Sequence, residues 1–190
     1  MTTAQLQLPF DLPVQTPPKR NDRWLRKSRR TNAYAGKRIT VSEVLVPQHD
    51  VDILKLSHEF IKDIDLDEQM EPDVVCLTCI NVRNDMDRQY LNMFIAYAGD
   101  EPVGFLVGST TPALHRRGIV AEQKLWYVTE NARGTPAAKL LIREFERWAK
   151  LNGATQIFTG TANKRYAERT SQLLEQLGYE RVGALHVMEI

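Results

Sequence analysis

The spacing of apolar residues changes at about residue 38. Before that point, prolines and basic residues interrupt every apolar run, whereas from Ile39 onward apolar positions recur with the periods of strands and helices. The stretch ITVSEVLVP is rich in β-branched residues and predicts a strand. The next stretch, DVDILKLSHEFIKDI, has apolar residues three or four positions apart, which predicts an amphipathic helix with Ile53, Leu56, Phe60 and Ile64 on its inner face.

The middle of the chain alternates between the two periods. Pro72 and Asp73 predict the start of a second helix, running to about residue 83, although VVCLTCINV is also compatible with a strand. A hairpin follows, in which YLNMFIAYA and VGFLVGST flank the turn GDEP. After the connection TPALHRRG, the run IVAEQKLWYVT predicts a further strand.

The last third predicts two helices and three short strands. The first helix runs from Pro136 to about residue 151, and its inner face is formed by Ala138, Leu141, Phe145 and Trp148. The run ATQIFTG predicts a strand, and residues 167–177 predict a helix that ends at Gly178. The runs YERVG and ALHVMEI predict two short strands that close the chain. The whole order predicts one α/β domain with a mixed sheet.

The net charge of the chain also changes sign near residue 38, where the apolar spacing changes. Residues 19–38 hold nine Lys or Arg against one acid, a net charge of +8, whereas residues 39–190 hold 16 basic and 22 acidic residues, a net charge of −6. We expect residues 1–37 to form a basic, Pro-containing arm, attached to the domain at 38–190 and dispensable for its folding. Basic residues around Trp24 favour a protein or nucleic-acid partner for residues 19–38, with a solvated tail as the alternative.

Composition excludes several other classes. No run approaches the roughly 18 apolar residues of a membrane span, and MTTAQLQLPFDLP does not resemble a signal peptide, so we expect a cytoplasmic protein without membrane contact. Cys76 and Cys79 are the only cysteines, which excludes a disulfide framework. Their CLTC spacing lacks two further zinc ligands, so we expect two buried, unreactive thiols and no metal.

Candidate chemistry lies at the strand-to-helix junction ENARGTPAAKLL. A helix N-terminus presents unpaired N–H groups and partial positive charge, and after a loop of small residues it suits a pyrophosphate. Thr135 is the expected N-cap and Pro136 the first helical residue, while Ala137 and Ala138 keep the approach open and Arg133 adds a cation. An ordinary capped helix explains the same residues equally well.

From this junction the chain resembles the GCN5-related N-acetyltransferase (GNAT) family, particularly its phage-type members. The resemblance covers residues 39–190 and rests on the strand LWYV, the Arg-Gly junction, the helix KLLIREFERWAKLNGA and the terminal LLEQLGYERVG. The family's acetyl-CoA signature is Gln/Arg-x-x-Gly-x-Gly/Ala. Arg133 fills its first place and Ala138 its last, but Pro136 stands where the family has Gly, which removes one N–H donor.

The resemblance implies an acyl-CoA N-acyltransferase fold, with a mixed, mostly antiparallel sheet flanked by helices. It implies transfer of an acetyl group from acetyl-CoA to an amine of a protein or small molecule. The backbone of KLWYV would pair with the pantetheine arm of CoA. The cofactor-binding residues that it implies are Tyr127, Val128, Arg133, Gly134, Thr135, Ala137, Ala138 and Asn163.

Catalytic residues are less clearly marked. Glu122 stands where some family members carry a catalytic Glu, and strand alternation predicts that it shares a face with Lys124 and Trp126; an exposed Glu at the end of a sheet is the alternative. Leu174 occupies the place of the family's usual acid, a Tyr. Tyr166 is the nearest substitute, or else a packing residue.

A second function class competes with the enzyme. The departures at Pro136 and Leu174 favour a non-catalytic structural or interaction module on the same fold, for example a virion or complex component anchored by its basic arm. Nucleic-acid binding through the arm is a third alternative. A phage-encoded protein would work in the host cytoplasm or the virion, and a homo-oligomer remains open.

Overall fold

The chain divides into two units, Met1–Thr31 and Asn32–Ile190. The computed structural model describes residue 34 and residues 36–64, 71–84, 90–114, 117–160 and 166–183, all in the second unit. The basic run at 19–30 therefore lies outside the described residues.

Five strands of the described chain form one sheet in the order β1-β2-β3-β4-β5. They are β1 (Ile39–Glu43), β2 (Leu91–Ala98), β3 (Glu101–Pro112), β4 (Ile119–Val128) and β5 (Ala154–Phe158). The first four are antiparallel to their neighbours, whereas β5 is parallel to β4. This confirms the mixed sheet that the order of elements predicts and the mostly antiparallel arrangement that the family resemblance implies.

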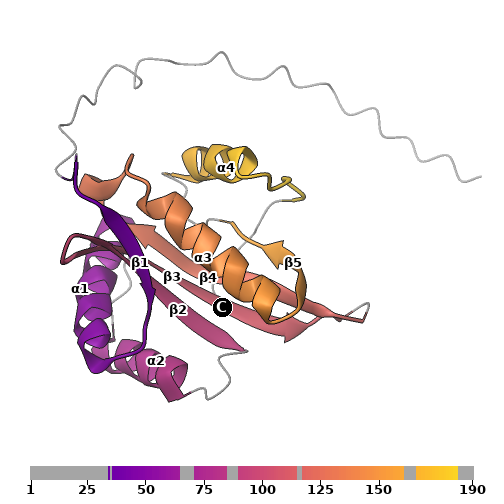
Figure 1. The fold of residues 1–190 in the computed structure, drawn as a ribbon, viewed down its shortest axis with the longest axis horizontal. Helices are drawn as coiled ribbons and strands as arrows, with labels where there is room; N and C mark the ends of the chain where they lie inside the picture. The colour runs from indigo at the N-terminus through magenta and orange to yellow at the C-terminus, as the bar shows by residue number, and fades with distance from the viewer. Residues whose placement is uncertain are drawn as a thin grey trace, which may run out of the picture. The chain divides into compact units, whose positions relative to one another are not determined.

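Helices cover both faces of the sheet (Figure 1). On one face lie α1 (Pro47–Ile64) and α2 (Pro72–Asn84), and on the other lie α3 (Ala137–Leu151) and α4 (Ala167–Gln176). The stretch VVCLTCINV is thus part of the helix α2 and does not form a strand. Its N-terminal Pro72 and Asp73 favour a helix start, and Arg83 at its end pairs with Asp50 of α1.

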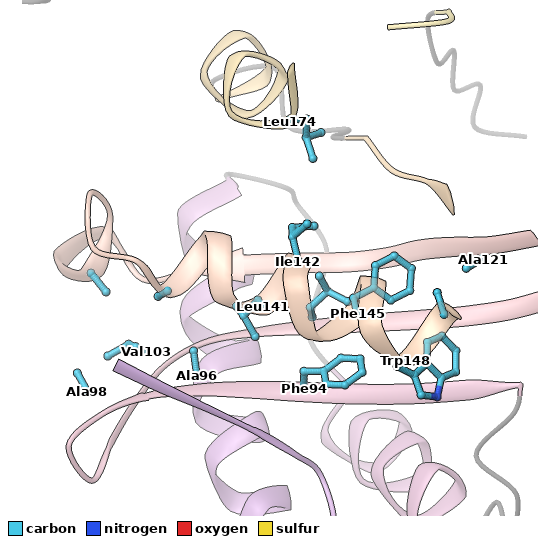
Figure 2. Packing of buried hydrophobic residues seen from close by; sticks show 14 of the residues in the cluster. Phe94, Ala96, Ala98, Val103, Ala121, Leu141, Ile142, Phe145, Trp148 and Leu174 are labelled. Carbon is cyan, nitrogen blue, oxygen red and sulfur yellow. The ribbon is translucent and has the colours of Figure 1, made fainter. Parts of the chain in front are cut away.

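The core on the α3 face consists of aromatic and aliphatic side chains (Figure 2). Phe145 and Trp148 stack with ring centroids 5.9 Å apart, and Trp148 meets Phe94 of β2 edge-on at 6.3 Å. Ala137 is buried in this core while Ala138 is only half-buried, so the inner face of α3 is rotated by one residue at its start from the face that the sequence predicts.

The core on the other face joins α1 and α2 to the sheet. Ile53 and Leu56 of α1 are buried there against Phe105 and Tyr127, as the helical spacing of α1 predicts. Cys79 of α2 is buried in the same cluster. Two separate cores therefore hold the sheet between them, which fixes β3 and β4 from both sides.

The folded core includes a residue that precedes Arg38 in the chain. Tyr34 lies within the predicted arm, yet its side chain is buried in the core of the α3 face. Its hydroxyl donates a 2.7 Å hydrogen bond to Glu101, and the N–H of Lys37 donates to its carbonyl. A truncation that removed Tyr34 would therefore cut into the core.

The end of the chain differs from its prediction. Residues 179–183 form no strand, so the prediction for YERVG is wrong, and the predicted strand ALHVMEI lies outside the described residues. The reason is the end of α4. Gly178 has a φ of 95°, and the N–H of Tyr179 then bonds back to Leu174, while its hydroxyl donates to Glu146 of α3.

Gly108 tests how tightly β3 and α3 pack. A Cβ at this position would lie 2.3 Å from Cε2 of Phe145, whose ring is fully buried. We expect Gly108→Ala to lower the free energy of unfolding by about 1–3 kcal/mol, as overpacking does. Gly160→Ala, with no atom within 4 Å of the added carbon, should change it by less than about 0.5 kcal/mol. Equal urea midpoints for the two variants would contradict this packing.

Candidate active site

The described part of the chain leaves one edge of β4 open along its second half. β5 pairs with β4 only from Ile119, opposite Ala154, to Glu122, opposite Phe158. Immediately beyond, the side-chain oxygen of Gln123 accepts hydrogen bonds from the Thr159 hydroxyl at 3.0 Å and the Gly160 N–H at 3.2 Å, which ends the pairing. No strand among the described residues pairs with 124–128 on this side. An open edge presents backbone donors and acceptors to whatever lies beside it.

A bulge on β4 lies at the start of this open edge. Gly108 of β3 pairs with Gln123 and Val107 pairs with Leu125, so Lys124 has no partner opposite it. The extra residue reverses the alternation of side chains beyond it. Trp126 consequently packs in the core of the α3 face, whereas Leu125 and Tyr127 point to the α1–α2 face. The prediction that Trp126 shares a face with Glu122 is therefore wrong.

Glu122 lies at the last rung of the β4–β5 pairing. It is opposite Ser109 of β3 and Phe158 of β5, and its carboxylate pairs with the ammonium group of Lys124. Ala121 faces the α3 core, so alternation places Glu122 on the α1–α2 face. The half-exposed carboxylate thus stands where the two strands separate.

The loop after β4 turns the chain into α3. The short 3₁₀ helix η2 (Glu130–Ala132) follows β4, and Gly134 then adopts a φ of 91°, which few residues other than glycine tolerate. The N-cap is Pro136, one residue later than predicted. Thr135 still supports the junction, because its hydroxyl donates to Ala132 at 2.7 Å and accepts from the Ala137 N–H at 3.3 Å.

The first turn of α3 presents free backbone donors. Its first α-helical hydrogen bond runs from the Leu140 N–H to the Pro136 carbonyl. The helical pattern therefore offers no acceptor to the N–H groups of Ala138 and Lys139. No acidic residue lies in this turn, so the positive end of the helix dipole is not neutralised there.

The Arg133 side chain contacts α1, β4 and Tyr166. Its guanidinium pairs with Asp63 of α1, and its Nε–H donates to the Val128 carbonyl at 3.1 Å. The ring of Tyr166, which precedes α4, lies 4.2 Å from the guanidinium carbon, and the Tyr166 hydroxyl donates to Asp63 at 3.3 Å. Arg133 thus ties α1, β4 and the start of α4 together. The sequence predicts that Arg133 supplies a cation to an anionic ligand, but in the structure its guanidinium is already paired with Asp63.

Burial and the charge of Asp63 both shift pKa values in this cluster. Burial lowers the pKa of the Arg133 guanidinium, but its hydrogen bond to Asp63 and the charge of that carboxylate outweigh burial, so the net change is upward. Burial, and then the charge of Asp63, raise the pKa of the Tyr127 phenol well above its usual value. Tyr127 therefore stays neutral, and its ring packs 5.5 Å from that of Phe60.

Buried polar atoms without partners lie along the same strands. Within the described part of the chain, no hydrogen bond reaches Nε1 of Trp126, Oγ1 of Thr129 or Oγ of Ser109. Unsatisfied buried groups are rare in native proteins, and two of these three, in Trp126 and Thr129, lie on or next to the open half of β4.

An apolar pocket opens on the α1–α2 face beside this edge. It has a volume of about 270 Å³ and is lined by Ser57, Phe60, Ile61, Glu71, Val74, Val75, Phe105 and Leu125. Leu125 belongs to the open half of β4. A larger hollow lies around the β2–β3 turn, from Lys37 to Pro102, and includes no residue of β4.

Other predicted residues have simpler surroundings. Leu174 is buried against the α3 face and supplies no proton (Figure 2), and Asn163 lies outside the described residues. Burial raises the pKa of the Cys79 thiol to about 12, as expected for an unreactive cysteine, but Cys76 is only half-buried. The described residues contain no cluster of ligands that would hold a metal, and none of their helices is long and apolar enough to cross a membrane.

Residues 57–179 match the model of the acetyltransferase (GNAT) family. The match spans more than half of the chain, from α1 to the end of α4, and includes the open edge of β4 and the junction before α3. The protein belongs to this family. Comparison with curated protein sequences finds no match.

Solved structures share the fold at low sequence identity. The aminoglycoside N-acetyltransferase AAC(6')-Iy in complex with CoA is 16% identical, with a TM-score of 0.65 over 82% of this chain and 96% of that one. The ribosomal-protein-alanine N-acetyltransferase from Brucella melitensis is 14% identical, with a TM-score of 0.62 over 80% and 99%. A transcriptional regulator from Bacillus halodurans is 21% identical, with a TM-score of 0.63 over 80% and 100%.

The tie between Arg133 and Asp63 should contribute to stability. Both side chains are largely buried, with 22% and 15% exposed, so removing one charge leaves the other poorly solvated. We expect Asp63→Asn to lower the free energy of unfolding by about 1.5–3 kcal/mol in urea denaturation. Glu144→Gln, which breaks the more exposed pair with Arg147, should cost less than about 0.5 kcal/mol. Similar losses in both variants would show that the tie is no stronger than a surface pair.

Proposed function

We propose that this protein transfers the acetyl group of acetyl-CoA to a primary amine. The observation that carries the proposal is the open half of β4, which is followed, after the loop at 129–136, by a helix N-terminus whose first N–H groups have no acceptor within the helix. An extended ligand with amide groups can pair with the first, and a pyrophosphate can bind the second. CoA contains both groups at opposite ends of one arm. The family match and the CoA complex of a structural neighbour support the same assignment.

The residues at each end fit this ligand. The backbone of 124–128, including Tyr127 and Val128, pairs with the amides of the pantetheine arm. The N–H groups of Ala138 and Lys139 bind the pyrophosphate, while Gly134, Thr135 and Ala137 shape the loop that brings it close. The side chain of Arg133 holds this loop to α1 through Asp63 and is not itself the phosphate ligand. Asn163 remains a proposed contact from the sequence.

The chemistry requires a neutral amine and a polarised thioester. Acetyl-CoA supplies the activated acetyl group, and a backbone N–H at the β4 bulge polarises its carbonyl. Glu122, at the point where β4 and β5 separate, takes one proton from the ammonium form of the acceptor. The neutral nitrogen then bonds to the carbonyl carbon, the C–S bond breaks, and CoA leaves as a thiol that carries the second proton of the nitrogen. Its carboxylate faces the α1–α2 side of the sheet, the same side as the apolar pocket.

The non-catalytic alternative is not favoured. Pro136 supplies no N–H, but the next free donors, those of Ala138 and Lys139, remain in place. The family and the structural neighbours described above include acetyltransferases. We retain as proposals from the sequence a phage-type origin, a place in the host cytoplasm or virion, and a protein or nucleic-acid partner for the basic run at 19–38.

Cofactor binding can be separated from folding at Ala138. Its half-buried side chain lies in the first turn of α3, where a carboxylate improves the interaction with the helix dipole but repels a pyrophosphate. We expect the wild-type protein to bind acetyl-CoA in a calorimetric titration. Ala138→Asp should weaken that affinity at least 10-fold, since two charges about 4 Å apart repel by roughly 4 kcal/mol at an effective dielectric constant of 20. Its melting temperature should not fall.

A matched substitution, Ala138→Ser, adds bulk without charge and should bind acetyl-CoA nearly as the wild type does. Absence of both heat and thermal stabilisation with millimolar acetyl-CoA in the wild type would refute the proposed function.

The role of Glu122 has its own test. Glu122→Gln keeps the shape of the side chain and removes the base, so we expect kcat to fall by about 100-fold or more while the Kd for acetyl-CoA stays within about twofold. Glu168→Gln, which alters an exposed acid on α4, is the control. Turnover is followed by release of free CoA thiol. A kcat equal to that of the control would remove Glu122 from the mechanism.

A further inference from the structure

The pocket beside the open half of β4 has the wrong character for a highly charged acceptor. Six of its eight lining residues are apolar: Phe60, Ile61, Val74, Val75, Phe105 and Leu125. Ser57 and Glu71 are the polar members, and Glu71 is the one carboxylate of this lining. A ligand with several ammonium groups would lose hydration here and find one counter-charge, which is unfavourable.

Two of the apolar walls are exposed to solvent. Leu125 is 44% exposed and Val74 is 52% exposed, and they face the pocket from β4 and α2 respectively. Scattered exposed apolar residues need no explanation, but a pair that borders one hollow next to a reactive strand does. Covering both with an apolar group of a substrate would remove this surface from water.

The position and the volume of the pocket limit which group of a substrate it can hold. Leu125 is in the segment of β4 proposed to hold the pantetheine arm, so a group in this pocket lies beside the thioester end of that arm. The volume of about 270 Å³ is below the roughly 300–1,000 Å³ of sites for drug-sized ligands. It exceeds the roughly 150 Å³ cavity that holds benzene in an engineered protein. One branched aliphatic or phenyl group therefore fits within it.

We propose that the acceptor is a primary amine whose neighbouring substituent is a single apolar group of about the size of a Leu or Phe side chain. The inference rests on the proposed acetyl transfer and specifies its substrate class. The apolar group enters the pocket between α1, α2 and Leu125, and the ammonium group of the acceptor is attracted to Glu71 of the same lining as it approaches. The ammonium then gives one proton to Glu122 and attacks the thioester as a neutral amine, as in the proposed transfer. Either a free amine or the N-terminal residue of a peptide presents this chemistry.

The test compares acceptors that differ only in the apolar group. With saturating acetyl-CoA, kcat/KM is measured for isopentylamine against ethanolamine, for Leu-Gly-Gly against Ser-Gly-Gly, and for the polycation neamine. We expect at least a 10-fold preference for the apolar member of each pair, since single apolar groups in a hydrophobic pocket are worth roughly 10–200-fold. A higher value for Leu-Gly-Gly than for isopentylamine identifies a peptide N-terminus, and the reverse a free amine.

Matched variants connect the preference to the pocket. Leu125→Gln should reduce the preference for isopentylamine over ethanolamine to less than threefold, while Leu151→Gln, at a 75% exposed leucine on α3, should leave it unchanged. Preference for ethanolamine or neamine, or an unchanged preference in Leu125→Gln, overturns the inference. Binding of acetyl-CoA without transfer to any of these apolar amines also overturns it. Failure to bind acetyl-CoA overturns the proposed function itself.

Discussion

The proposed ligand site depends on the incomplete pairing between β4 and β5. The two strands pair for four positions and then separate. At the point of separation, the side-chain oxygen of Gln123 accepts hydrogen bonds from the Thr159 hydroxyl and the Gly160 N–H. A fully paired β4 would satisfy its own backbone and leave nothing for a partner. The separation leaves 124–128 as an open edge that is nevertheless rigid, since β3 and two cores hold it from the other sides.

A second constraint is the set of contacts that Arg133 makes at the C-terminal end of β4. Arg133 connects the loop after β4 to Asp63 of α1 and to Tyr166 before α4, three segments that are remote in sequence. Buried ion pairs often add little net stability, but they fix geometry. Here the geometry is that of the loop bearing Gly134 and the first turn of α3. In the proposed site, the pair therefore positions the loop without binding the anion, which the N–H groups in the first turn of α3 would bind instead.

Local patterns predicted most elements of the fold, because each apolar spacing belongs to an element with its own core face. The helices α1 and α3, the β2–β3 hairpin and β4 all follow from such spacing. Three features did not follow. The β4 bulge depends on register with β3, the partner of Arg133 lies 70 residues away, and the end of α4 uses Tyr179 in a cap instead of a strand. Each depends on contacts between distant segments, for which the local pattern of residues gave no signal. The pocket was missed for the same reason, since Phe60, Val74 and Leu125 come from three different elements.

Hydrogen exchange of backbone amides, measured on the full chain with and without acetyl-CoA, tests the central claim most directly. An open β4 edge and free N–H groups on α3 should exchange rapidly alone and become protected together when the ligand pairs with them. The account predicts slower exchange in peptides covering 123–128 and 134–140, and little change at the β2–β3 turn around Gly99. Protection confined to other segments, or none at saturating acetyl-CoA, would contradict it.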